Sequence, residues 1–224
     1  MNQIHIPSVE QHNRNASRLK ALFQITRQLF GPIGVNIFGN ILVHHMRDNS
    51  VQQGYYHDSA HMFAVAIEAD EIAAYHGLNV ETRQALFIAS LYHDYGHSYG
   101  RQKDINNIHK AIGHFLSHCE KYDFVNSLGI KQETIAIICN MIMCTHYPFV
   151  NEPCNYAASI LRDADLLMSI QPDVDYFADG LKKEFDNQLI EVNVTPQEMR
   201  KFALSQKFYT DYARNKLESY VQKD

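Results

Sequence analysis

The stretch Leu91-Tyr92-His93-Asp94-Tyr95-Gly96-His97 places an imidazole, a carboxylate and a second imidazole directly after an apolar run. That run, Ala85 to Leu91, fits a buried helix, with His93-Asp94 at its C-terminal end. Partial negative charge gathers at this end of a helix and favours a cation. A carboxylate after so apolar a run is costly to bury unpaired. The stretch therefore predicts the middle of a metal site, although a helix end that simply reaches water would also fit.

Helical periodicity extends over nearly the whole chain, and strand patterns are almost absent. Gly and Pro residues mark the breaks between periodic segments. We expect one all-α domain of about nine helices over residues 1–224. The expected helices are Val9–Leu29 after the cap Ser8, Asn36–Met46, Ser59–Tyr75, Val80–Asp94, Asn107–Lys121, Lys131–Thr145, Asn155–Ser169, Val174–Leu189 and Pro196–Val221.

Composition narrows the class of protein. With 224 residues, 46% of them hydrophobic and 20% charged, the chain can bury a sizeable core. A net charge of -5 argues against a binder of duplex nucleic acid, which needs a basic face. The four cysteines form no C-x-x-C pair, and no apolar run approaches the roughly 20 residues of a membrane span. We expect a soluble, cytoplasmic protein with free thiols and no membrane partner.

Two further segments carry side chains of the ligand type. In Tyr56-His57-Asp58-Ser59-Ala60-His61, the two imidazoles are four residues apart and would share a helix face if the helix begins early enough. Near the end of the helix expected at 155–169, Asp163 and Asp165 interrupt an apolar surface. One of them can pair with Arg162, and the other needs a partner, for which a metal is one solution. Solvated helix faces would also explain both segments, so the residues alone leave the ligand open.

Taken in order, His61, His93-Asp94 and Asp165 form an H…HD…D pattern that resembles the HD-domain metal-dependent phosphohydrolases. The resemblance covers roughly residues 54–168, the motif core, and implies a single all-α bundle of the HD type whose separate helices supply ligands to one or two divalent metals. It implies that these four residues bind the first metal and that Asp94 also reaches the second. Ala164-Asp165-Leu166 matches the family's Ala-Asp-hydrophobic ending, which favours Asp165 over Asp163.

The spacing His57-x-x-x-His61 followed by His93-Asp94-x-x-His97 is also similar to the branch with the class I cyclic-nucleotide phosphodiesterases. This likeness implies that His57 is the general acid and that His97 lies near the waters of the second metal, so that His57, Asp94 and His97 are the catalytic candidates. The Asn that follows the first motif His in that branch is Asp58 here, and the chain is shorter than those catalytic domains. The substrate is therefore not fixed by the likeness.

We expect a metal-dependent phosphohydrolase that cleaves a phosphate ester of a nucleotide or another small molecule, with a 3′,5′-cyclic nucleotide as the narrower expectation. Imidazole and carboxylate ligands suit one or two ions of Zn, Mn, Mg or Fe and do not choose among them. Two such ions about 4 Å apart can clamp a phosphate and activate a water. His57 titrates in the range that a leaving-group acid needs, and Arg101 and Lys103 could touch a phosphate.

Two alternatives remain from the sequence. Some HD proteins use extra histidines for the second metal, for which His109 and His146 are the candidates here, and such a site would suit a di-iron oxygenase. A non-catalytic HD protein that binds nucleotides is the other alternative. The sequence also leaves the oligomeric state open, a homodimer included.

Overall fold

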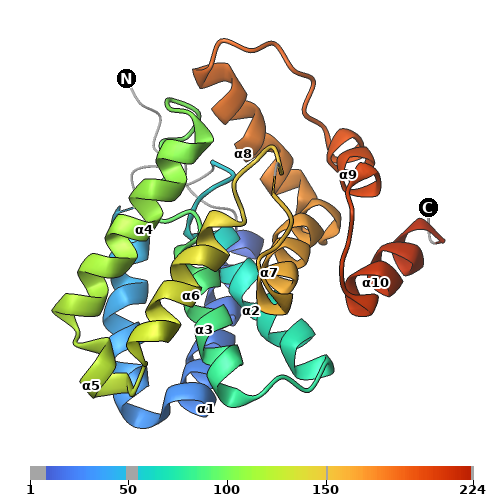
Figure 1. Ribbon diagram of the computed structural model, residues 1–224. Helices are drawn as coiled ribbons and strands as arrows, with labels where there is room; N and C mark the ends of the chain where they lie inside the picture. Colours follow the sequence, from blue (N-terminus) through green and yellow to red (C-terminus); the bar gives the residue numbers. More distant parts are fainter. Residues whose placement is uncertain (1–8, 49–54, 150, 223–224) are drawn as a thin grey trace.

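The computed structural model describes residues 9–48, 55–149 and 151–222, without the side chains of residues 9–15, 47 and 48. The expected cap Ser8 and the residue that opens the motif core, Gly54, lie outside the described residues. Within them the fold is all-α without strands, which confirms the fold class (Figure 1). The elements are α1 Val9–Asp48, α2 Ser59–Tyr75, α3 Val80–Tyr92, α4 Asp104–Lys121, α5 Phe124–Leu128, α6 Gln132–Met143, α7 Tyr156–Leu167, the 3-10 turn η2 Met168–Ile170, α8 Val174–Asn187, α9 Pro196–Ser205 and α10 Asp211–Val221.

The core forms around α2 and α3, which lie against each other. α2 also packs on α1 and α7, and α3 also packs on α6. Every residue of α3 from Ala85 to Tyr92 is buried, which explains why this run is apolar on all sides. One connected cluster of buried apolar side chains reaches from Leu22 in α1 to Ala213 in α10. No described helix has the length and apolar character to cross a membrane.

The predicted break at Gly31-Pro32 is present as a kink inside α1. Gly31 adopts φ 67° and ψ -165°, which is not helical and which a residue with a Cβ rarely adopts. The helix resumes at once with Pro32, whose fixed φ suits the first turn of a helix. The expectation that the second helix begins only at Asn36 is therefore wrong, because Pro32 already lies in the helical segment that follows the kink.

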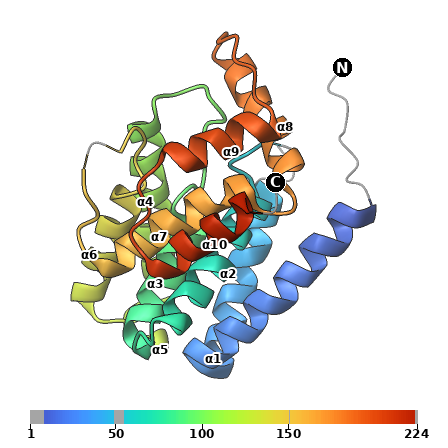
Figure 2. The same cartoon turned by 90° about the vertical axis from the view of Figure 1, so that its right-hand side faces the viewer.

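The expected helix Pro196–Val221 is wrong, because the chain turns between α9 and α10. The carboxylate of Asp163, fully buried in α7, accepts the backbone N–H of Tyr209 at 3.0 Å and of Thr210 at 2.7 Å. These N–H groups are thereby withdrawn from a helical ladder, and Thr210 caps α10 instead. The two helices lie across the face formed by α7 and η2 (Figure 2).

The sequence suggested that Arg162 pairs with Asp163 or Asp165, but in the structure it pairs with neither carboxylate. Its guanidinium donates to the backbone carbonyl of Cys144 at 3.2 Å and of Asn151 at 2.9 Å. It also lies 4.4 Å from the ring centre of Phe149. Arg162 therefore holds the segment that follows α6, and the carbonyls take the place of the expected carboxylate.

We expect Asp163→Ala to lower the free energy of unfolding by roughly 1–3 kcal/mol, because two N–H groups at the turn before α10 lose their acceptor. Urea unfolding measures this loss, and limited proteolysis should show new cleavage at residues 206–210. Asp211→Ala is the control, since its ion pair with Arg214 lies on the exposed surface and should contribute little. Equal unfolding curves for both variants would contradict the role of Asp163.

Candidate metal centre

Asp58 decides where α2 begins. Its carboxylate accepts the backbone N–H of Ala60 at 2.9 Å and of His61 at 3.1 Å, while Tyr176 donates its hydroxyl to the other oxygen. The helix therefore starts one residue after Asp58, and His57 lies outside it. The helix face that His57 and His61 were expected to share is not formed, although their ring centres are only 5.8 Å apart.

A tight turn follows α3 and presents its side chains toward α2. The backbone N–H of His97 donates to the carbonyl of Asp94 at 3.0 Å. Gly96 lies between them with φ 78°, and a Cβ at this position would approach Nε2 of His114 to 2.9 Å. The backbone conformation favours glycine at this position, and a larger residue would also require the His114 side chain to move.

Four side chains from α2, the end of α3 and α7 meet in what we call the buried cluster: His61, His93, Asp94 and Asp165. Nε2 of His61 lies 3.3 Å from Nε2 of His93 and 3.3 Å from Oδ2 of Asp94. The same atom lies 3.1 Å from Oδ1 of Asp165. Nε2 of His93 lies 2.9 Å from Oδ2 of Asp94. The structure thus brings together the four residues proposed as ligands of the first metal.

The arrangement of protons makes this cluster suited to a cation. Nδ1 of His93 lies 2.7 Å from the carbonyl of Ser90, so it donates there, and in the neutral ring Nε2 carries a lone pair. That lone pair faces His61 and a carboxylate, and such atoms repel unless a proton or a metal ion lies between them. In the protein without metal a proton does so. Burial lowers the pKa of His93, but Asp94, Asp165 and the hydrogen bond to the Ser90 carbonyl together outweigh burial and raise the pKa to about 9.

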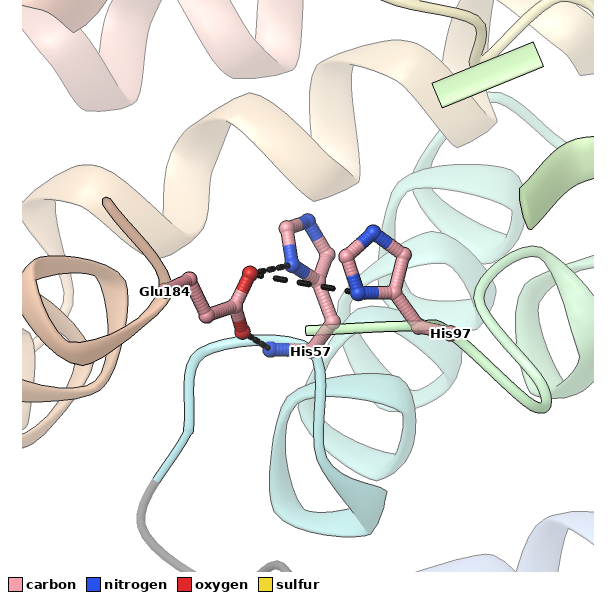
Figure 3. Close-up of side chains that lie close together, drawn as sticks. All are labelled: His57, His97 and Glu184. Atoms are coloured by element: carbon pink, nitrogen blue, oxygen red, sulfur yellow. Dashed lines mark hydrogen bonds and ion pairs between the residues drawn. The ribbon is translucent and has the colours of Figure 1, made fainter. Parts of the chain in front are cut away.

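A second cluster contains a residue that the sequence did not indicate. Glu184 of α8 accepts the backbone N–H of His57 through Oε1 at 2.9 Å. Its Oε2 lies 2.6 Å from Nδ1 of His57 and 3.9 Å from Nδ1 of His97 (Figure 3). Figure 3 shows that both rings direct their other nitrogen away from Glu184. We call these three residues the proton-donor cluster.

Close packing of α8 on the chain before α2 places Glu184 in this cluster. A Cβ on Gly180 would lie 2.5 Å from the backbone nitrogen of Tyr56, so no other residue allows this approach. Gly180 is one helical turn before Glu184 and lies on the same face. In the sequence, the one feature that could have pointed to Glu184 is the glycine four residues before it. Its significance becomes clear only when the backbone at Tyr56 is known to pack against that glycine.

Glu184 gives the two imidazoles opposite protonation states. Burial lowers the pKa of His57, but the carboxylates of Glu184 and Asp94 outweigh burial and raise it from 6.5 to about 10. Burial and the charged His57 lower the pKa of His97 to about 3. Nδ1 of His97 accepts the backbone N–H of Tyr99 at 3.0 Å. The three side chains lie close enough to hold a metal, but both Nδ1 atoms already have partners, which favours a charged imidazole beside a neutral one.

The other residues that the sequence suggested as metal ligands or phosphate contacts lie outside the two clusters. His109 is exposed on α4, His146 is half-buried after α6, and neither belongs to a group of metal-ligating side chains among the described residues. Asp163 is engaged with the turn before α10 and so is separate from the buried cluster. Lys103 lines the cavity described next, whereas Arg101 does not.

A cavity of about 530 Å³ opens onto both clusters. Asp94 and Asp165 of the buried cluster line it together with all three residues of the proton-donor cluster. Its volume is in the range of small-molecule sites. The opposite wall is apolar and comes mainly from α8, α9 and the segments beside them: Tyr147, Phe149, Leu181, Phe185, Val192, Val194, Met199 and Phe202.

We expect the purified protein to contain about one or two divalent ions per chain, because ligand atoms of His61, His93 and Asp165 lie within 4.8 Å of one another, with Asp94 beside both imidazoles. Plasma mass spectrometry measures the content, and His61→Ala and Asp165→Ala should each lose the bound ion. His109→Ala is the matched control, an exposed histidine outside the cluster that should keep the full content. Equal metal in all four proteins would contradict the site.

We expect Glu184→Gln to lower the pKa of His57 from about 10, because the strongest of the charges that raise it is lost while burial remains. Proton NMR titration of the ring measures this shift. Because folding raises the pKa of His57, protonation of this ring stabilises the folded protein. The stabilisation is complete below pH 6.5 and is lost as the pH rises through about 10. The variant should therefore lack that part of the alkaline decline in stability. An unshifted His57 titration would rule out Glu184 as its partner.

Comparisons with protein-family models, with curated proteins and with solved structures found no match for this chain. The site therefore has to be interpreted from its own atoms. These are a buried set of two imidazoles and two carboxylates, a charged imidazole held by a glutamate beside it, and a largely apolar cavity that opens onto both.

Proposed function

We propose that this protein is a metal-dependent phosphohydrolase that cleaves a phosphate ester of a nucleotide or another small molecule. The observation that carries the proposal is the convergence of His61, His93, Asp94 and Asp165, with Nε2 of His61 within 3.3 Å of a ligand-type atom of each of the other three. Their H…HD…D order resembles the HD-domain phosphohydrolases, and the observed proximity supports that resemblance.

Two imidazole nitrogens and two carboxylates fit a divalent ion of the Zn, Mn, Mg or Fe type, and they do not distinguish among these. Such an ion, when bound, lowers the pKa of a coordinated water to near neutral and withdraws charge from a phosphate. Ser90 fixes the ring of His93 from behind through its carbonyl, which keeps Nε2 free for this role. Asp94 lines the cavity and has a second oxygen available, so it is the residue that would serve a second ion.

His57 is the proton donor in this proposal. Ester hydrolysis forms a bond from a water oxygen to phosphorus and breaks the bond from phosphorus to the leaving oxygen, which then needs a proton. With its pKa raised to about 10, His57 carries that proton at neutral pH. Glu184 holds Nδ1, so Nε2 is the atom that gives the proton to the leaving group. His97 is neutral and donates a hydrogen bond from Nε2 to the phosphate or to water.

The charge of the cavity favours a substrate with a single phosphate. Lys103 is the sole Lys or Arg among the described residues that line it, whereas Asp104 and Glu198 add negative charge beyond the two clusters. Apart from the charged His57 and the proposed metal ions, the described lining offers one cation, which suits a single phosphate better than a triphosphate. The wall with Tyr147, Phe149 and Phe202 suits a planar or apolar group. A phosphate monoester or diester with such a group fits best, and a 3′,5′-cyclic nucleotide is the narrower proposal.

The two alternatives lack a supporting observation. A di-iron oxygenase of this type needs further histidine ligands, and His109 and His146 are outside both described clusters. A protein that only binds nucleotides needs no leaving-group acid, yet His57 and Glu184 are held 2.6 Å apart beside the cavity. The hydrolase accounts for both clusters.

We expect the metal-loaded protein to release phosphate or open a cyclic phosphate in a screen of cyclic nucleotides, nucleoside monophosphates, nucleoside triphosphates and a chromogenic phosphate ester. Chelation and His93→Ala should each abolish turnover. His57→Ala should lower kcat by about 10²–10⁴-fold, because the leaving group loses its proton donor. Glu184→Gln should shift the alkaline limb of the kcat–pH profile to lower pH, because it lowers the pKa of His57. Product chromatography and colorimetric phosphate assay measure these rates.

His109→Ala provides the control and should retain the rate of the unmodified protein, since that histidine is exposed on α4. Full turnover after stringent removal of metal would contradict the proposal. Faster cleavage of triphosphates than of monoesters and diesters would contradict the substrate class alone.

A further inference from the structure

Two of the four cysteines lie beside each other at the edge of the cavity. Cys144 ends α6 and is buried, whereas Cys154 is exposed ten residues later. The backbone N–H of Cys154 donates to Sγ of Cys144 at 3.4 Å. A disulfide needs two cysteines in such proximity, and joining them here requires a small movement of an exposed residue.

Three described residues between the two cysteines form part of the cavity wall. Thr145, Tyr147 and Phe149 all line the cavity that faces the buried cluster. The guanidinium of Arg162 holds this segment noncovalently, through the carbonyl of Cys144 and the ring of Phe149. A covalent link between the cysteines would fix the ends of the same segment.

We infer that Cys144 and Cys154 are an oxidation site, at which a small-molecule disulfide converts the two thiols to an intramolecular disulfide that stiffens this wall of the cavity. The pair is set apart by the hydrogen bond from the backbone of Cys154 to Sγ of Cys144, by the exposure of Cys154 and by its position on either side of residues that line the cavity. Its consequence for catalysis rests on the proposed function, whereas the formation of the bond does not.

The reaction proceeds by two exchanges. The thiolate of exposed Cys154 attacks one sulfur of the small disulfide, forms a mixed disulfide and releases one small thiolate. The thiolate of Cys144 then attacks Sγ of Cys154 and releases the second small thiolate, so two protein thiols are oxidised while one disulfide is reduced. Burial, followed by the neighbouring Cys144 thiol, raises the pKa of Cys154 to about 11, which makes the first exchange slow at neutral pH.

Peptide mass mapping tests the bond in a Cys119→Ala/Cys139→Ala background, which removes the other two thiols. Treatment with oxidised glutathione under mildly alkaline conditions should link Cys144 to Cys154, with the loss of two hydrogens and no retained glutathione. Cys144→Ser in this background should keep glutathione on Cys154, and Cys154→Ser should stay unmodified. A background protein that keeps glutathione on Cys154 without forming the link would overturn the inference.

Hydrogen exchange and kinetics test the effect on the wall. The oxidised protein should exchange the amides of residues 145–149 at least threefold more slowly, and its KM should change at least threefold with little change in kcat. Reduction should reverse both effects. Unchanged exchange would overturn the stiffening. If the reduced protein shows no turnover, the proposed function is wrong. The mass map and the exchange rates would still test whether the disulfide forms and whether it stiffens the segment.

Discussion

The buried cluster brings two imidazoles and two carboxylates so close together that they must share a proton or a cation. Nε2 of His61 is 3.3 Å from Nε2 of His93, and both approach a carboxylate. Folding removes these groups from water, and the shared proton or cation offsets the cost of burying their charges. The packing of α2 against α3 and α7 supplies the opposing stabilisation. The tightly packed helices of the core thus hold the side chains of the buried cluster close to one another.

The proton-donor cluster solves a different electrostatic problem. Its two rings lie 3.9 Å apart, too close for both to carry charge. Glu184 is nearer to His57 than to His97, so the proton remains on His57, and the N–H of Tyr99 occupies the lone pair of His97. One buried carboxylate therefore gives two neighbouring histidines different roles. This separation of roles is what a site needs when it must supply a proton beside a cation.

Helix α7 connects the buried cluster with the walls of the cavity. Successive residues of a helix project about 100° apart, so Arg162, Asp163 and Asp165 face three directions. Arg162 reaches the segment after α6, Asp163 reaches the turn before α10, and Asp165 reaches His61. The same geometry explains why Asp165 and not Asp163 joins the cluster. It also explains why the wall that carries Phe149 is tied to the helix that supplies Asp165.

The sequence by itself determined the all-α class and most of the helices, because periodicity and caps such as Asn79 act within a few residues. It also pointed to the ligand-type residues of the buried cluster, since polar groups at the end of a buried helix need a partner. Only the tertiary structure decided the place of Glu184, which is 127 residues from His57, and the turn at Tyr209, which is 46 residues from Asp163. An amphipathic pattern reports that a side chain is buried, but the partner it meets depends on how distant helices pack.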